Sequence, residues 1–241
     1  FANKFTLNIG KTEIIKMKNN NVLTERDVKI AKFLFQFRFA TVEQIHAFLG
    51  EKSTVENLRG RLEKLTHYRI LNKFMLGAYE YDNIQPEAFE IYCLDLGGRY
   101  LLANYSNEDT TDWYSAVNMV GSEIVSKRLF ITQFYIRLRE TLGSRLVHFR
   151  AEPEFRSGKK TIIPSFDFSI QDGLLKRNYV GEVVRDFDLP VNFREKSAKL
   201  EQLLITNAWK KYYYDSEEAP VLFVFGEDDY NALEAAKMIT N

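Results

Sequence analysis

Three short stretches, each with a hydroxyl residue at its start, constrain the fold of this chain more than any other feature of its sequence. They are TERD at Thr24, TVEQ at Thr41 and STVE at Ser53. A Ser or Thr oxygen at the start of a helix accepts a hydrogen bond from a free amide of the first turn, so each stretch is typical of a helix start. The spacing of apolar residues behind them predicts helices over about 25–37, 42–49 and 54–68.

Two apolar runs follow the third of these helices. ILNKFML begins at Ile70 and FEIYCLDL begins at Phe89, and the polar segment YDNIQPEA lies between them. Two such runs separated by turn residues are typical of a β-hairpin, here one with a long tip. Three capped helices followed by a hairpin predict a winged helix-turn-helix domain over 24–105, preceded by an N-terminal extension over 1–23.

The helix predicted over 54–68 has two different faces. Its apolar stripe is formed by Val55, Leu58, Leu62 and Leu65. The opposite side carries Asn57, Gly60, Lys64 and His67, with Arg59 and Arg61 on its flanks. Because side chains three and four positions apart share a face of a helix, the stripe faces the core and the polar side faces solvent.

The polar side of this helix has the chemistry of a recognition helix. Amide and guanidinium groups reach base edges, cations hold phosphates, and a small residue allows close approach. The segment 24–76 also has ten Lys or Arg against six Asp or Glu. We predict base readout by Asn57, Arg59 and Arg61, and phosphate contacts by Thr54, Lys64 and Lys73. The alternative is an ordinary solvated helix face.

The composition of the chain limits its partners and its location. Its 33 basic and 33 acidic residues cancel, so attraction to a polyanion must come from a local patch. The single cysteine, Cys93, excludes an internal disulfide and disfavours a cysteine-based zinc site. No apolar run approaches the roughly 20 residues that span a bilayer. We therefore expect a cytoplasmic protein without a membrane partner.

The remainder of the chain predicts a second domain. A polar linker and one long helix, the latter over 115–142, occupy 106–142. GSRLVHFRAEP, KTIIPSFDFSI and RNYVGEVVRD then read as strands, followed by a charged helix over about 192–211, the strand PVLFVFG and a last helix over about 228–238. Strands flanked by helices predict an α/β domain over 143–241. The fold class is therefore α+β.

Two carboxylates in the second domain suggest a metal-dependent nuclease. A site of the PD-(D/E)XK type places an Asp on one strand and Glu-x-Lys on the next, so that the carboxylates bind Mg²⁺ and the lysine positions the attacking water. Asp167 and Glu182 occupy the carboxylate positions, but residue 184 is Val, and no nearby lysine obviously replaces the missing one. Three interpretations stay open: structural carboxylates, a vestigial metal site, and an active nuclease.

The order of these pieces resembles the replication-relaxation family of bacterial mobile-element proteins. The matching stretches are LTERDVKIAKFLFQFRFATVEQIHAFL, STVENLRGRLEKLTHYRILNKF, YCLDLGGRYLLA, IIPSFDFSI, GEVVRDFD and FREKSAKLEQLL, within 23–225. The resemblance implies a DNA-binding winged helix joined to a restriction-endonuclease-like domain that serves replication and DNA relaxation. The family's PD is PSFD here and its EVD is EVV, which weakens the carry-over of catalysis to Asp167 and Glu182.

We therefore expect a sequence-specific double-stranded DNA-binding protein of a plasmid or conjugative element. It would act in replication, relaxation or transfer without enzymatic activity or a cofactor, and a partner such as a relaxase or replication initiator would supply the chemistry. A homodimer would suit paired half-sites. The alternatives are a Mg²⁺-dependent nuclease that uses Asp167 and Glu182, a winged-helix transcriptional regulator, and a protein-interaction module.

Overall fold

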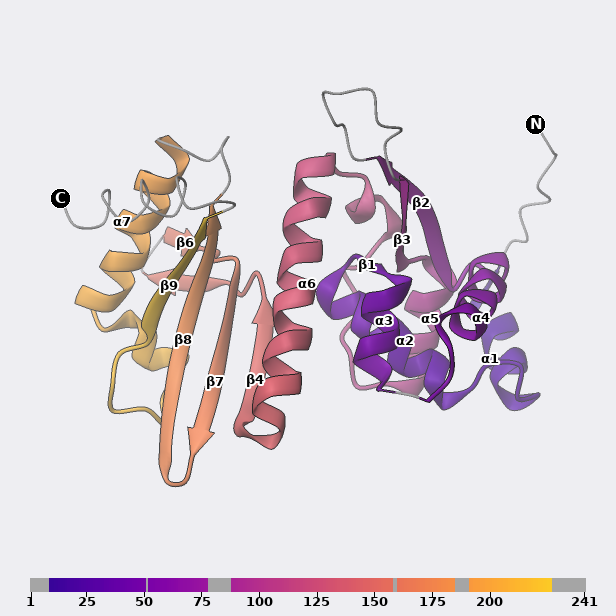
Figure 1. Ribbon diagram of the computed structural model, residues 1–241, viewed down its shortest axis with the longest axis horizontal. Coiled ribbons are helices and arrows are strands. Elements are labelled where there is room, and N and C mark those ends of the chain that lie inside the picture. Colours follow the sequence, from indigo (N-terminus) through magenta and orange to yellow (C-terminus); the bar gives the residue numbers. More distant parts are fainter. Residues whose placement is uncertain (1–8, 51, 78–87, 158–159, 185–190, 227–241) are drawn as a thin grey trace. The chain divides into compact units, whose positions relative to one another are not determined.

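The chain folds into mixed α and β structure, which a computed structural model describes for residues 9–50, 52–77, 88–157, 160–184 and 191–226 (Figure 1). It divides into two compact units, Phe1–Ile136 and Arg137–Asn241. Within the described ranges, no helix combines the length and the apolar character needed to cross a bilayer.

The first unit contains helices packed around a small sheet. Its elements are α1 (Lys11–Asn19), α2 (Glu25–Phe37), β1 (Ala40–Thr41), α3 (Val42–Leu49), α4 (Val55–His67), β2 (Leu71–Gly77), β3 (Ala88–Leu94), α5 (Leu96–Tyr105), η1 (Ser115–Asn118) and α6 (Ser122–Leu142), the last of which runs on into the second unit. The helices predicted over 25–37 and 42–49 are confirmed at both ends, and the third is one residue shorter at each end. The long hairpin tip lies outside the described residues.

The predicted helix caps are present, with one change of residue. The Thr24 amide and hydroxyl both donate to Asp27 Oδ2, at 2.6 and 2.9 Å. Thr41 Oγ1 accepts from the Gln44 amide at 3.3 Å. The cap of α4 is Thr54 rather than Ser53, because its hydroxyl accepts from the amide three residues on. These caps satisfy donors that the first turn of a helix leaves unpaired.

The sheet of the first unit has the strand order β1-β3-β2, and both pairings are antiparallel. Strands β2 and β3 pair from Leu71 opposite Leu94 to Gly77 opposite Ala88. The apolar stripe of α4 packs into the core of this unit, since Leu58, Leu62 and Leu65 are fully buried. Burial of each leucine contributes about 1.5–3 kcal/mol. The core therefore fixes which side of α4 faces outward.

The helix predicted over 115–142 is interrupted near its start. A short 3₁₀ turn, η1, precedes a break that includes Gly121, and α6 begins only at Ser122. Glycine is among the poorest helix formers, which accounts for the break. The first part of α6 is joined to the first unit by hydrogen bonds from Gln44 Nε2 to Leu129 O at 2.9 Å and from Thr132 Oγ1 to Phe39 O at 3.1 Å.

The second unit is built on a four-stranded sheet. Its elements are β4 (Leu146–Ala151), β5 (Phe155–Ser157), β6 (Lys160–Ile162), β7 (Phe166–Asp172), β8 (Leu175–Val184), α7 (Val191–Ile205), η4 (Ala208–Lys211) and β9 (Val221–Gly226), after a short turn η2 (Gly143–Arg145). The strand order is β4-β7-β8-β9, and only β8 and β9 are parallel (Figure 1). The helix predicted over 192–211 ends earlier because Asn207 has a left-handed backbone. The last predicted helix lies outside the described residues.

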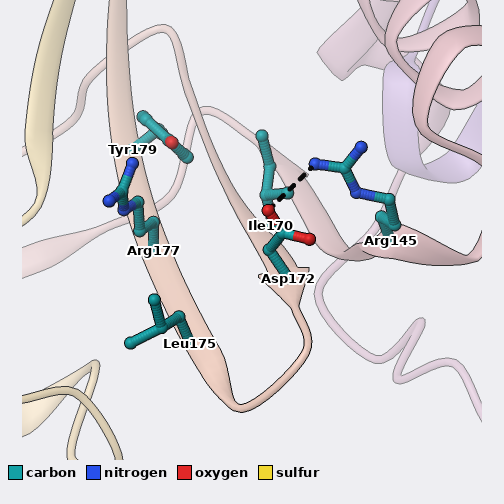
Figure 2. A pocket seen from close by; sticks show the side chains of 6 residues that line it. All are labelled: Arg145, Ile170, Asp172, Leu175, Arg177 and Tyr179. Atoms are coloured by element: carbon teal, nitrogen blue, oxygen red, sulfur yellow. Dashed lines mark ion pairs between the residues drawn. The ribbon is translucent and has the colours of Figure 1, made fainter.

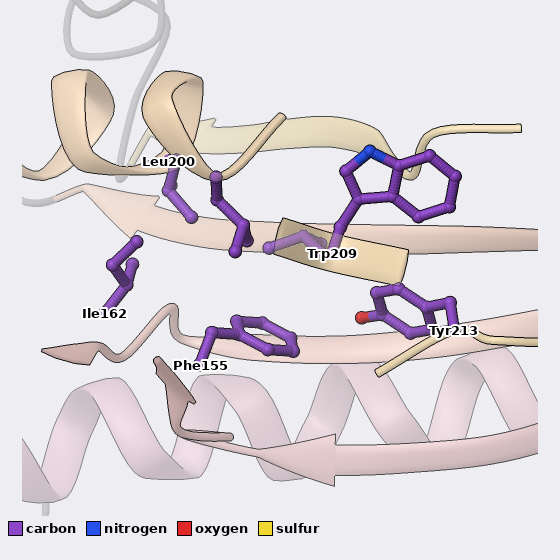
Figure 3. Close-up of a cluster of buried hydrophobic side chains, with 7 residues drawn as sticks. Phe155, Ile162, Leu200, Trp209 and Tyr213 are labelled. Atoms are coloured by element: carbon purple, nitrogen blue, oxygen red, sulfur yellow. The ribbon is translucent and has the colours of Figure 1, made fainter. Parts of the chain in front are cut away.

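The two faces of this sheet carry different side chains. One face packs against α7, η4 and the β5–β6 pair through a buried cluster: Phe155, Ile162, Val180, Leu200, Leu203, Trp209 and Tyr213 (Figure 3). The other face carries a ladder of aromatic rings with centroids 4.8–6.3 Å apart: Phe149, Phe166, Phe168, Tyr179, Phe223 and Phe225. Gly181 is required here, since a Cβ would lie 2.1 Å from the Phe166 ring. This alternation aims Asp167 and Glu182 at the first face.

Candidate nucleic-acid interface and carboxylate pair

The outward side of α4 is polar and open to solvent. Thr54, Asn57, Gly60, Lys64 and His67 are all exposed, opposite the buried leucines. Among the residues that the structure describes, Lys64 has no ion-pair partner. Three of the residues predicted to contact DNA, namely Thr54, Asn57 and Lys64, are therefore directly accessible on this face.

Arg61 has a different environment. Its Nε donates to Asp27 Oδ1 at 2.9 Å, and its Nη2 donates to the Val22 carbonyl at 2.7 Å and to the second oxygen of Asp27. The Asp27 carboxylate is fully buried, and the hydrogen bond to it raises the pKa of Arg61. A base contact by Arg61 would leave that carboxylate buried and unpaired. The geometry thus gives Arg61 a place in the packing of α4 against α2.

Arg59 and Lys73 share one carboxylate. Arg59 Nη1 donates to Glu90 on β3, and its Nη2 lies 3.8 Å from Glu43. Lys73 Nζ donates to the other oxygen of Glu90 at 3.0 Å and also to Glu63. The Arg59 and Lys73 side chains retain 43% and 26% of their exposure, so solvent reaches both. The charges of these two predicted DNA-contact residues are therefore neutralised in the free protein, although their side chains are not buried.

Asp167 in the second unit is held by protein donors on both oxygens. Arg150, directly opposite on β4, donates from Nε to Oδ1 at 2.9 Å and from Nη2 to Oδ2, and the Tyr213 hydroxyl donates to Oδ2 at 2.6 Å. His148 Nε2 lies 3.6 Å from Oδ2. Burial alone would raise the pKa of Asp167, but these neighbours outweigh burial and lower it. Burial raises the pKa of Tyr213, and the Asp167 charge raises it further.

Glu182 is engaged in the same way. Its Oε2 accepts from the Ser165 amide at 3.1 Å, and its Oε1 accepts from the Ser165 hydroxyl at 2.8 Å and from Lys196 Nζ at 2.7 Å. Lys196 lies on α7, fourteen residues further along the chain. From the sequence, no lysine was found to replace the one missing at residue 184, and Lys196 was not identified. The spacing of charged residues along FREKSAKL carries no signal for its partner.

The carboxylate pair does not fit a magnesium site in this arrangement. Asp167 and Glu182 lie on one face of the β7–β8 pair, since Asp167 faces Val180 and Glu182 is two residues on. All four carboxylate oxygens accept hydrogen bonds from protein groups, whereas Mg²⁺ needs such oxygens as ligands. Within the described part of the chain, no group of three or more His, Cys, Asp or Glu residues is arranged to hold a metal.

Described residues of the second unit line cavities on both faces of its sheet, and one on each face bears on function. The smaller, of about 140 Å³, is lined by Arg145, Ile170, Asp172, Leu175, Arg177 and Tyr179, and Figure 2 shows Arg145 reaching toward Asp172, 3.6 Å away. The larger, an open cleft of about 300 Å³, is lined by His148, Arg150, Lys176, Tyr212, Tyr213, Tyr214 and Asp215. Neither was predicted. The run KKYYYD at 210–215 was the available signal for the second.

Comparisons with known proteins show no family for this chain. No protein-family model matches the sequence, and no curated protein matches it either. Among solved structures, the restriction endonuclease FokI aligns with 90% of this chain and 41% of its own length, at 12% identity and a TM-score of 0.29. A likeness at that level carries no argument about fold or activity. The class that the structure defines is thus a mixed α/β protein with two compact units.

Proposed function

We propose that the chain is a double-stranded DNA-binding protein, and that its first unit is a winged helix-turn-helix domain that presents α4 to the duplex. The observation that carries this proposal is the element order α2, β1, α3, α4, β2, β3, in which the third helix buries one leucine stripe and exposes Asn57 and Lys64. In helix-turn-helix proteins the recognition helix lies in the major groove with such residues toward the bases.

The contacts fall into two groups under this proposal. Thr54, Asn57 and Lys64 are accessible without any rearrangement. Arg59 and Lys73 become available when phosphates replace their carboxylate partners, which are the shared Glu90, Glu43 for Arg59 and Glu63 for Lys73. Because ion pairs at the surface contribute only about 0–1 kcal/mol, this exchange costs little. Arg61 acts indirectly, since it holds α4 against α2 through Asp27.

In its narrower form, the proposal assigns the protein to a plasmid or conjugative element, where it acts in replication, DNA relaxation or transfer. The resemblance of the sequence stretches to the replication-relaxation family supports this form. Chemistry on the DNA would then belong to a partner such as a relaxase or replication initiator. The proposed domain would bind paired half-sites as a homodimer.

The test is a fluorescence-anisotropy titration of the full chain with duplex DNA at several salt concentrations. The logarithm of the association constant falls with the logarithm of salt concentration, with a slope of about −0.9 for each phosphate that is neutralised. Lys64→Ala should reduce the slope by about 1 and weaken binding. Lys11→Ala, which changes an exposed lysine of α1, is the matched control. A salt-independent titration, or equal effects of both substitutions, would refute the proposal.

A further inference from the structure

The larger cleft of the second unit combines aromatic and cationic side chains in a way that the proposed duplex contacts of α4 leave unexplained. It lies on the same sheet face as Asp167, and three consecutive tyrosines, Tyr212 to Tyr214, form one of its walls. Two of them have structural roles. Tyr213 is buried and donates to Asp167, and the Tyr212 hydroxyl contacts the backbone of Arg156.

Tyr214 has no such role. It retains 87% of its exposure, which places a large aromatic ring at the edge of the cleft in full contact with water. Tyrosine rings that pack in a core lose most of their exposure, as Tyr213 does. An exposed ring beside a polar cleft offers a flat surface on which a planar group can stack.

The cations around the cleft supply the complementary chemistry. Arg150 and Lys176 line it, and Lys210 and Lys211 are exposed in the turn that leads into the tyrosines. Lys176 is paired with the exposed Asp215 at 2.6 Å, and this pairing lowers the pKa of Asp215. An ammonium has three donors, so Lys176 can bind an anion alongside Asp215. The site therefore combines a stacking surface with donors for a phosphate.

We propose that this cleft binds one unpaired nucleotide of a single-stranded nucleic acid. The base stacks on Tyr214 and Lys176 holds the adjoining phosphate, while Arg150, which stays paired with Asp167, adds positive charge beside it. The cleft volume of about 300 Å³ lies at the lower limit of ligand pockets, which suits a single base. A duplex keeps its base faces stacked on one another, so only an unpaired base can use an exposed tyrosine.

The test is an anisotropy titration of the full chain with two fluorescent oligonucleotides, oligothymidylate and oligouridylate. Each is about ten nucleotides long, a length within the usual site sizes for single-stranded nucleic acid. Tyr214→Ala and Lys176→Ala should each weaken binding of at least one oligonucleotide by about fivefold or more, the lower limit expected for loss of one stacked base or charge contact. The two oligonucleotides distinguish DNA from RNA as the source of the nucleotide.

Two matched controls separate the cleft from the rest of the surface. Tyr114→Ala removes another exposed tyrosine, in the first unit, and Arg177→Ala removes the cation next to Lys176 that lines the cavity on the other sheet face (Figure 2). Both should leave oligonucleotide binding unchanged. All four side chains lie wholly or partly at the surface, and circular dichroism checks that each variant folds.

The outcomes are distinct from those of the duplex proposal. If neither oligonucleotide binds, or if Tyr214→Ala has no more effect than Tyr114→Ala, the cleft is not a nucleotide site. The nucleotide-site proposal would also be overturned if Lys64→Ala abolished oligonucleotide binding and Tyr214→Ala did not. A duplex titration that Tyr214→Ala leaves unchanged, beside weakened oligonucleotide binding, would show two separate sites.

Discussion

Arg61 of α4 and Asp27 of α2, which are 34 residues apart, form an ion pair in which the carboxylate is fully buried. The same carboxylate accepts from the Thr24 amide at the start of α2. One buried charge therefore joins the cap of α2 to the middle of α4. This pair therefore adds a polar link between α2 and α4 to the packing of the leucine stripe.

Arg61→Ala should destabilise the protein, since it leaves the Asp27 carboxylate buried without its cation. Removal of one partner of a buried ion pair costs about 3–5 kcal/mol. Urea denaturation followed by circular dichroism should show a lower midpoint for the transition of the first unit. Lys64→Ala should leave that midpoint unchanged. An unchanged midpoint in Arg61→Ala would mean that the pair does not hold α4 in place.

Glu90→Gln should strengthen duplex binding. The substitution removes the charge that Arg59 and Lys73 share. Each cation keeps its own pair, with Glu43 or Glu63, but is freer to bind a phosphate. The salt slope should become steeper by up to about 1.8, or about 0.9 for each added phosphate contact. Glu13→Gln, on the exposed side of α1, controls for the change in net charge. If the two variants bind DNA equally well, Glu90 does not restrain this surface.

Acid should destabilise the second unit through Asp167. Because the folded-state pKa of Asp167 is lowered, its contribution is complete above the unfolded-state pKa of about 3.9 and is lost as the pH falls through the folded-state value. The melting temperature of Asp167→Asn should therefore depend less on pH below about 4. Asp172→Asn, at an exposed position, should retain the pH dependence of the unchanged protein. Parallel pH profiles for all three would show that Asp167 does not contribute.

Lys196→Ala should lower the stability of the second unit by about 1.5–3 kcal/mol, the usual contribution of a hydrogen bond to a charged group. Glu182 is 3% exposed and would lose this ammonium donor while keeping the hydrogen bonds from Ser165. Thermal unfolding is the measurement. Lys199→Ala, on the same helix, removes only a pair with the fully exposed Glu195 and should have little effect. Equal effects of the two substitutions would contradict the buried pairing.

Magnesium should not bind at Asp167 and Glu182, because their oxygens already accept from Arg150, Tyr213, Ser165 and Lys196. Millimolar Mg²⁺ or Mn²⁺ should leave the melting temperature unchanged, and supercoiled DNA should remain intact. The informative variant is Asp167→Ala. Cleavage by the unchanged protein that disappears in this variant would establish the nuclease alternative.

The sequence by itself determined part of the local structure of this protein. Hydroxyl caps and the 3.6-residue spacing of apolar side chains placed α2, α3 and α4 to within a residue at each end. Apolar runs bounded by turn residues located β2, β3 and β7. These features depend on backbone geometry and on neighbours a few residues away. Such local features can therefore be predicted without knowing which tertiary contacts the segment makes.

Only the tertiary structure decided which charged groups meet. Arg61 lies 34 residues from Asp27, Lys196 lies 14 from Glu182, and Tyr213 lies 46 from Asp167. A long charged side chain can reach several partners with similar free energy. Tertiary packing selects one of them, because it decides which elements lie side by side and because burial of an unpaired charge is unfavourable. That is why spacing predicted Arg61 as a base contact, whereas the folded chain pairs it with Asp27.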